Sequence, residues 1–376
     1  MTTPPEIKGW CPGALRPMMS GDGLVVRIRP FGGRLRRAQV DGLATLAAAH
    51  GNGLIDLSSR GNIQIRGVRE DSHPKLIDGL ARMGLVDETP EIESRRNMLV
   101  TPFWLTGDST ERFTAELTAA LSAEDAPRIP HKFGFAVDTG REPVLQTASA
   151  DIRLERDAGG GFILLADGLP AGKPVTSDSM VSEALALAHW FVAHRGAHNR
   201  MAALLASGQR LPAGFFVPRQ RQSYQPKPGF TPLGAMVGLA FGQLQVETLA
   251  SLAKHGGLRM TPWRMLLVES ARQLPEIEDL ITDPDDPLLR IVACTGAPRC
   301  PQGFIETRPI ARQLAPHLSD GQFLHVSGCA KGCAHPRPAP LTVTGTPDGL
   351  NLIENGHASD APARENLTLQ DLTKAI

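Results

Sequence analysis

An internal repeat constrains the fold of this chain more than any other feature of its sequence. Residues 40–47 are VDGLATLA and residues 246–253 are VETLASLA, and each stretch is followed by a glycine turn, at Gly51 and at Gly257. A unit that occurs twice in one chain predicts a pseudo-twofold arrangement. Each unit is too small to bury both of its faces alone, so we expect the two to pack together into one domain.

The first unit is expected to contain five regular elements. Apolar residues recur at helical spacing over 35–50, and the glycines that follow end that helix. Short β-rich stretches, one of them alternating between apolar and polar residues, predict strands. The predicted order is strand, helix, strand, strand, helix, over residues 24–29, 35–50, 54–57, 63–65 and 73–83.

The repeat divides the chain into four parts. The two units occupy residues 15–88 and 228–286, and two longer α/β segments occupy residues 92–225 and 288–350. A chain of 376 residues is long enough to build ordinary hydrophobic cores in several such parts. The polar tail after residue 346 indicates little about its own role.

Four of the five cysteines lie in the last of these segments. They form two pairs, Cys294-x5-Cys300 and Cys329-x3-Cys333, and both pairs are surrounded by glycine and proline. Small residues let the backbone approach a bulky inorganic ligand and donate N–H groups to it. Four thiolates suit either a tetrahedral zinc ion or a [4Fe–4S] cluster.

Three interpretations of these four cysteines compete. Zinc sites usually space the cysteines of a pair two to four residues apart, so the five-residue gap counts against zinc. Disulfides need an oxidising compartment, and nothing in the sequence indicates export. An iron–sulfur cluster is therefore the favoured interpretation. The fifth cysteine, Cys11, is expected to be either a partly buried thiol or a residue that lines the site.

Overall charge predicts no partner, because 39 basic residues balance 39 acidic ones. We therefore expect no nucleic-acid partner. Nine arginines lie between Arg16 and Arg69, against three acidic residues from Asp22 to Asp56, which would suit a polyanionic ligand. The first residues contain no apolar run or cleavage signature, and no later segment approaches the length of a membrane helix, so we expect a cytoplasmic protein without a membrane association.

The cysteine spacing resembles that of the sulfite and nitrite reductase family. In those enzymes four cysteines hold a [4Fe–4S] cluster, and the last, here Cys333, also bridges to a sirohaem iron. The order of the four parts resembles the same family over roughly residues 10–345. The resemblance implies an α+β fold in which two ferredoxin-like half-domains are related by pseudo-twofold symmetry, with two added α/β segments, the last of which carries the cluster.

Within that family, five stretches resemble the precorrin-3B synthase branch of aerobic cobalamin biosynthesis: residues 11–13, 18–27, 55–67, 261–264 and 327–336. This resemblance implies a monooxygenase that uses O2 to hydroxylate precorrin-3A at C20 and forms a γ-lactone. The cluster would pass electrons and a second iron would activate O2. Sirohaem and a mononuclear non-haem iron remain open as alternatives for that iron.

Basic residues at family positions imply a site for an anionic tetrapyrrole. Arg60, Arg96 and Lys132 match family arginines and the first lysine of a Lys-Phe-Lys pair, which implies catalytic as well as binding roles, whereas Gly134 replaces the second lysine. Guanidinium groups bind carboxylates in bidentate fashion, and precorrin-3A carries eight of them. The candidate substrate-binding residues are Arg60, Arg66, Arg96, Lys132 and Arg264, where Arg264 aligns with Arg60 in the repeat.

Several histidines are weaker candidates. His194 and His198 share one face of an expected helix, but no carboxylate accompanies them, so metal binding is disfavoured. His131 and His335 adjoin the motifs above and are candidates for proton handling. No dinucleotide-binding motif occurs, so electrons are expected from an external reductase or ferredoxin.

Two other functions stay open from the sequence. One is a sirohaem-dependent sulfite or nitrite reductase, against which the missing lysine and the chain length argue. The other is a non-catalytic iron–sulfur electron carrier, which would not need the basic residues.

Overall fold

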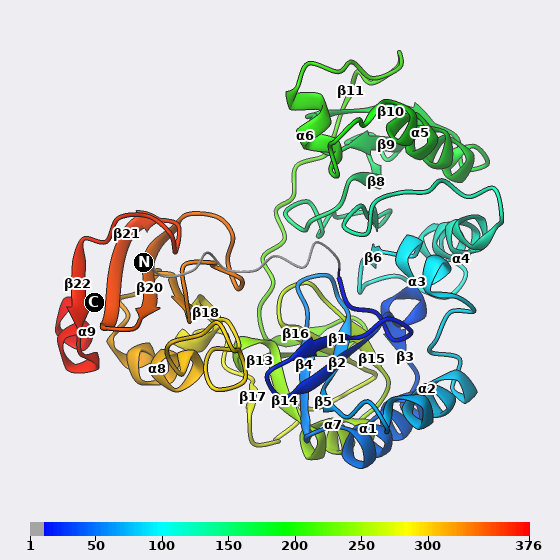
Figure 1. Cartoon of the computed structure of the whole chain (residues 1–376). Coiled ribbons are helices and arrows are strands. Elements are labelled where there is room, and N and C mark those ends of the chain that lie inside the picture. Colours follow the sequence, from blue (N-terminus) through cyan, green and yellow to red (C-terminus); the bar gives the residue numbers. More distant parts are fainter. Residues whose placement is uncertain (1–10) are drawn as a thin grey trace.

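The computed structural model describes residues 11–376 (Figure 1). The expectation that residues 1–13 are not a signal peptide concerns mainly the first ten residues, which lie outside this range. The described chain forms three bodies: the two repeated units packed together, a first α/β lobe built on strands β6–β11, and a second α/β lobe built on strands β18–β22. Within residues 11–376, no helix combines the length and apolar character that crossing a membrane requires.

The two units exchange strands, so each sheet contains residues from both copies. The first sheet has the order β1-β2-β5-β4-β14 and the second has the order β12-β13-β16-β15-β3, with β17 (Leu280–Ile281) also paired to β13. Strand β14 comes from the second unit and pairs antiparallel with β4, while β3 comes from the first unit and pairs antiparallel with β15. The strands of the first sheet are β1 (Met18–Ser20), β2 (Gly23–Ile28), β5 (Ile63–Val68), β4 (Leu54–Leu57) and β14 (Gln243–Gln245). Those of the second sheet are β12 (Gly229–Thr231), β13 (Gly234–Leu239), β16 (Met265–Glu269), β15 (Leu258–Met260) and β3 (Arg34–Leu35).

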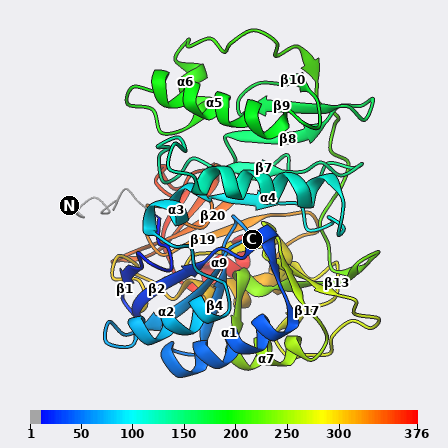
Figure 2. The same ribbon diagram turned by 90° about the vertical axis from the view of Figure 1, so that its right-hand side faces the viewer.

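The exchange confirms the predicted packing of the repeat. Helices α1 (Arg37–His50) and α7 (Val246–Ala253) contain the two copies of the repeated motif and lie side by side beneath the sheets, next to α2 (His73–Arg82) (Figure 2). One hydrophobic core runs through both units, so neither could bury its apolar residues alone. The elements predicted for residues 23–83 all occur close to their predicted limits.

A tight turn that recurs before each repeated helix shows the same symmetry in the backbone. The short helices η1 (Phe31–Gly33) and η2 (Ala240–Gly242) each contain a residue in the left-handed region, with φ of 61° at Gly32 and 60° at Phe241. Glycine adopts this conformation without a Cβ penalty, whereas phenylalanine does not. The turn geometry is therefore kept in the second copy at the expense of local strain.

The two α/β lobes share one topology. In the first lobe β6, β7 and β8 are parallel and β8 to β11 are antiparallel; in the second lobe β18, β19 and β20 are parallel and β20 to β22 are antiparallel. The first lobe contains β6 (Met98–Val100), β7 (Phe135–Val137), β8 (Ile152–Arg156), β9 (Phe162–Ala166), β10 (Ala171–Val175), β11 (Val217–Pro218), α3 (Pro90–Arg95), α4 (Ser109–Ser122), α5 (Met180–His194) and α6 (Met201–Ala206). The second contains η3 (Pro287–Arg290), β18 (Ile291–Ala293), α8 (Thr307–Leu314), η4 (Ala315–His317), β19 (Leu324–Ser327), β20 (Ala339–Thr346), β21 (Gly349–Gly356), β22 (Arg364–Leu367) and α9 (Leu369–Ala375).

The second lobe extends further along the chain than the boundary at residue 350 that we expected. Strands β21 and β22 complete its sheet, and Leu372 of α9 is fully buried in its core. The polar tail is thus part of the lobe, because a few apolar side chains in it are enough to cover one face of the sheet.

Candidate functional site

The loops that carry the four cysteines meet at one edge of the second lobe. Cys294 directly follows β18, and one residue, Gly328, separates Cys329 from β19. These strands are parallel neighbours, and the backbone N–H of Cys294 donates to the Val326 carbonyl at 3.3 Å. Because the carboxyl ends of parallel strands open at the same edge of a sheet, the first cysteine of each pair is brought to one place.

Three glycines allow these loops to approach closely. A Cβ on Gly328 would lie 3.3 Å from the Cα atoms of both Gly296 and Gly303, and a Cβ on Gly296 would lie 2.7 Å from the Ile305 carbonyl oxygen. The Gly328 N–H donates to Cys294 Sγ at 3.2 Å, as expected of a backbone that stabilises a thiolate. The glycines predicted to let the backbone approach a ligand therefore also let the two cysteine loops approach each other.

The four thiols form one electrostatic group. Burial raises the pKa of the Cys329 thiol, and the Cys294 and Cys300 thiols raise it further, while an N–H of Lys331 opposes both effects. The pKa of the Cys333 thiol is raised mainly by burial, and the other three thiols raise it further. A positively charged metal centre would relieve this mutual repulsion by stabilising the thiolates.

A single metal ion and a cluster place different demands on the four thiols. Within the described part of the chain, no three His, Cys, Asp or Glu side chains converge closely enough to hold one metal ion. A tetrahedral zinc needs such convergence. A [4Fe–4S] cube instead distributes four thiolates over four irons, so its ligands surround the cluster.

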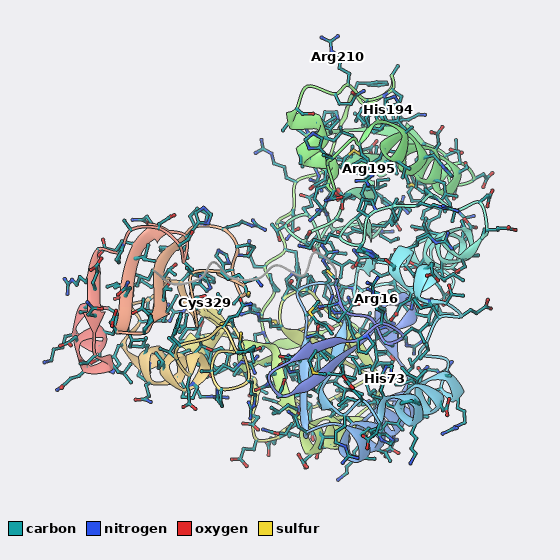
Figure 3. The ribbon with its side chains drawn as sticks, in the orientation of Figure 1. Arg16, His73, His194, Arg195, Arg210 and Cys329 are labelled. Carbon is teal, nitrogen blue, oxygen red and sulfur yellow. The ribbon has the colours of Figure 1, made fainter. Side chains whose placement is uncertain are left out.

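The cysteine loops lie where the second lobe contacts the other two bodies. The Gly21 N–H and the Ser20 hydroxyl of the first unit donate to the carbonyl of Arg299, next to Cys300, at 3.1 and 3.2 Å. Arg337, which follows the last of the four cysteines in the chain, donates to the Thr147 carbonyl of the first lobe at 3.5 Å. Figure 3 places Cys329 on the side of its lobe that faces the rest of the molecule.

Arg60 and Arg264 occupy equivalent places in the repeat and make equivalent contacts. Arg60 donates from Nη1 and Nη2 to the Lys132 carbonyl in the first lobe, both at 3.1 Å. Arg264 donates from Nη2 to the Ala334 carbonyl at 3.3 Å, in the loop that follows Cys333. Each arginine thus reaches from its own unit into one α/β lobe, and Arg60 lies against the backbone of Lys132.

A cavity of about 350 Å³ lies near this pair, and its walls include Cys11, Arg16, Arg29 and His131. His131 Nδ1 lies 2.7 Å from the Ser94 hydroxyl. Burial lowers the pKa of the Arg27 guanidinium to about 10, and the Cys11 thiol acts on Arg27 in the opposite direction. The walls also include Glu91 and Glu93, and Glu93 pairs with Arg29 at 3.5 Å, so Cys11 lies beside charges of both signs.

Arg66 and Arg96 have a different environment from the one that the sequence suggested. Arg66 pairs with Asp22 at 2.6 Å and approaches Asp56 at 3.7 Å, and Arg96 makes a bidentate pair with Asp87, with both contacts at 2.7 Å. Both arginines are buried. Because acidic partners already compensate their charges, these contacts support a structural role for both, and we retain only Arg60, Lys132 and Arg264 for a ligand site.

Sequence reasoning missed two residues beside Arg264. Arg308, on α8, pairs with Asp56 at 3.3 Å. Burial lowers the pKa of Arg264 to about 10, and the charge of Arg308 adds to this effect. His325, on β19, is fully buried, and burial lowers its pKa to about 4, with His335 and Arg264 adding to the effect. No motif or spacing in the sequence marks either residue; only their approach to Arg264 in space does.

The other predicted histidines have different surroundings: His194 lies far from the cysteines, whereas His335 follows Cys333 by two residues. His194 stacks on Trp190 with ring centroids 4.9 Å apart, and its Nδ1 lies 2.8 Å from the Trp190 carbonyl oxygen, in the first lobe far from Cys329 (Figure 3). His335 lies against Phe323 and His325, with centroid distances of 5.0 and 5.8 Å. A separate apolar cavity of about 390 Å³, with Phe103 and Phe230 among its walls, includes none of the predicted site residues.

Comparison with known proteins agrees with this architecture. Residues 16–83 match the nitrite/sulfite reductase ferredoxin-like half domain. Precorrin-3B synthase from Sinorhizobium sp is 30% identical, over 95% of this chain and 84% of that protein, and ferredoxin–nitrite reductase from Synechococcus elongatus is 25% identical, over 88% and 77%. The solved structure of the Mycobacterium tuberculosis NirA protein superposes with a TM-score of 0.64 at 17% identity, covering 93% of this chain and 79% of that one.

The chain therefore belongs to the nitrite/sulfite reductase family, with the α+β fold of ferredoxin-like half-domains that the sequence predicted. Within that family it is a homologue of precorrin-3B synthase. Its relatives of both kinds are oxidoreductases.

Proposed function

We propose that this protein catalyses the precorrin-3B synthase reaction. One oxygen atom of O2 enters precorrin-3A as the C20 hydroxyl group, and the ring A acetate closes a γ-lactone onto C1. The other oxygen atom leaves as water, which requires two electrons from an external ferredoxin or reductase. Similarity to a precorrin-3B synthase over 95% of the chain supports this proposal.

The packing around Gly134 favours this reaction over nitrite or sulfite reduction. The reductases that this chain resembles have a second lysine here. A Cβ on Gly134 would lie 2.7 Å from Asn97 Nδ2 and 2.9 Å from the Asn97 backbone oxygen, and the Gly134 N–H donates to the buried carboxylate of Asp151 at 2.9 Å. The local packing leaves no room for a side chain, so the proton-donating cation of a six-electron reductase has no place at this position.

The residues that would hold the iron–sulfur group are Cys294, Cys300, Cys329 and Cys333. When bound, a [4Fe–4S] cluster would supply electrons, and a second iron, as sirohaem or as a mononuclear centre, would activate O2. The protein's own contribution is to hold the cysteine loops where the three bodies meet, through the Arg264 contact to Ala334.

Arg60, Lys132 and Arg264 are proposed to bind the carboxylates of the tetrapyrrole. A guanidinium group presents paired N–H donors that match a carboxylate, and partial burial strengthens the interaction because water screens it less. Arg60 is already oriented by the Lys132 carbonyl, so less conformational entropy is lost when it binds a ligand.

The test combines metal analysis with labelled turnover. Anaerobically purified protein is analysed for iron, acid-labile sulfide and the visible spectrum, and is then given precorrin-3A, a reductant and ¹⁸O2. We expect four irons and four sulfides, with or without one further iron, and a product that has gained one labelled oxygen atom by mass spectrometry. Loss of substrate without uptake of label would contradict the proposal.

A sirohaem-dependent nitrite or sulfite reductase is the second candidate, and the 25% identity to a ferredoxin–nitrite reductase favours it. A stoichiometric sirohaem spectrum together with consumption of nitrite or sulfite by reduced protein would establish that activity instead. A cluster spectrum without tetrapyrrole binding or turnover would indicate an electron carrier.

A further inference from the structure

We propose that Arg264, Arg308 and His325 form a carboxylate-binding site beneath the Cys329–Cys333 loop. The first observation is a concentration of unpartnered buried atoms. Among the described residues, ten buried side-chain nitrogen and oxygen atoms have no hydrogen-bond partner, and five of them belong to these three residues: Nη1 of Arg264, Nε and Nη1 of Arg308, and Nδ1 and Nε2 of His325. Buried polar groups are normally hydrogen-bonded, so such a group of free nitrogens indicates a missing partner.

The three side chains come from different parts of the fold and meet at one place. Arg264 begins in the turn between β15 and β16, reaches the second lobe and binds the Ala334 carbonyl at 3.3 Å. His325 lies under the same loop, where a Cβ on Gly332 would be 3.7 Å from its Cε1. Arg308 extends from α8 to Asp56 of β4. The charge of Arg264 acts on His325, and that of Arg308 acts on Arg264.

The local charge is unbalanced, which favours an anion over water as the missing partner. Asp22 pairs with Arg66, and Asp56 pairs with Arg308 and more weakly with Arg66. Among the described residues, no acidic side chain lies within ion-pair distance of Arg264; Asp56, which is already paired with Arg308, only partly offsets the effect of burial on Arg264. Ordered water could satisfy hydrogen bonds here but could not compensate a largely desolvated charge, whereas a carboxylate does both.

The number of free donors favours a carboxylate. Nε and Nη1 of Arg308, Nη1 of Arg264 and one ring nitrogen of neutral His325 are four separate donor atoms, and the two oxygens of a carboxylate offer about four acceptor positions. In its choice of ligand the inference rests on the proposed function, since an acetate or propionate side chain of the tetrapyrrole would supply the carboxylate. The site itself stands on the unpartnered nitrogens alone.

The first test measures the site with small anions and does not depend on the proposed function. The thermal midpoint of the anaerobically purified, cluster-loaded protein is recorded in sodium acetate and in sodium chloride of equal ionic strength. We expect acetate to raise the midpoint of the wild type and of Arg312→Gln, but not that of Arg308→Gln. Arg312 lies one turn further along the same helix and is exposed, so its substitution is a matched loss of one positive charge.

The second test measures tetrapyrrole binding with uroporphyrin III, a stable porphyrin with eight carboxylates. Loss of one charge-assisted contact corresponds to roughly a 10- to 100-fold weaker affinity for Arg308→Gln, with no change for Arg312→Gln. Arg308→Lys keeps the positive charge that pairs with Asp56, so it is expected to fold if Arg308→Gln does not. It should lose less affinity than Arg308→Gln because the charge is retained, but some affinity because an ammonium does not reproduce the guanidinium donors.

The outcomes separate the inference from the proposed function. Equal acetate responses in the wild type, Arg308→Gln and Arg308→Lys would overturn the site. An acetate response that requires Arg308, together with unchanged uroporphyrin affinity in Arg308→Gln, would overturn the tetrapyrrole assignment and indicate a site for a small free carboxylate. Failure of labelled turnover with precorrin-3A, while both binding tests succeed, would reject the proposed reaction and leave the site in place.

Discussion

The buried pair between Arg96 and Asp87 allows a direct test of whether Arg96 is structural or binds a ligand. Arg96 Nε and Nη2 each lie 2.7 Å from a carboxylate oxygen of Asp87, and both side chains are 4% exposed. Nη2 also donates to the Arg29 carbonyl at 2.9 Å, and the guanidinium lies 3.8 Å from the centre of the Phe31 ring. Replacing Arg96 with methionine keeps much of the side-chain volume but leaves the Asp87 carboxylate buried without its counter-charge.

The expected cost follows from that geometry. Removing one partner of a buried, hydrogen-bonded ion pair lowers the free energy of unfolding by about 3–5 kcal/mol, because an uncompensated charge remains in a low-dielectric environment. Asp87→Leu should cost a similar amount. The double variant removes both charges, so its loss should be smaller than the sum of the two by about 2–3 kcal/mol, within the coupling expected for contacting residues.

The assay is urea-induced unfolding followed by far-ultraviolet circular dichroism for the wild type, both single variants and the double variant. Arg69→Met is the matched control, since Arg69 makes the same bidentate contact with Asp71, at 2.9 and 2.7 Å, on the exposed surface. We expect no measurable change for that control, because water screens exposed pairs. Unchanged stability in Arg96→Met, combined with weaker uroporphyrin binding, would refute the structural role.

Three further predictions concern single side chains. Cys329→Ser should lose the iron–sulfur chromophore while Cys11→Ser keeps it, and a full cluster spectrum in Cys329→Ser would reject the ligand assignment. Burial lowers the pKa of His325 from 6.5 to about 4, so the folded protein favours the neutral imidazole. The resulting contribution to stability is fully present above pH 6.5 and is lost as the pH falls toward 4. Relative to His325→Gln, the wild type should lose about 3 kcal/mol over this pH window. Burial raises the pKa of Asp138 from 3.8 to about 6, so its contribution to stability is largest at low pH and falls as the pH rises through this range. Relative to Asp138→Asn, the wild type should lose about 3 kcal/mol between pH 3.8 and pH 6, and parallel pH profiles for the two would contradict the assignment.

The sequence by itself identified the repeat, the elements of the first unit and the cysteine quartet. Helical periodicity, strand alternation and glycine turns are local properties, so residues 35–50 and 54–57 were predicted close to α1 and β4. The cysteine spacing can also be read directly from the sequence, and it identifies the two loops that can supply thiols. The resemblance to the nitrite/sulfite reductase family followed from these features and from short motifs, and the comparisons bear it out.

Tertiary structure alone decided which strands were exchanged between the units and which charges found partners. Nothing within β3 or β14 indicates that each completes the sheet of the other unit, because pairing depends on the distant strand that it meets. Arg96 and Arg264 look alike in sequence, yet Asp87 makes a direct ion pair with the first, whereas no described carboxylate makes a direct ion pair with the second. The unpartnered nitrogens of Arg308 and His325 also depend on tertiary structure. Burial and the approach of remote segments determine whether a polar side chain finds a hydrogen-bond partner, and neither can be read from the linear sequence.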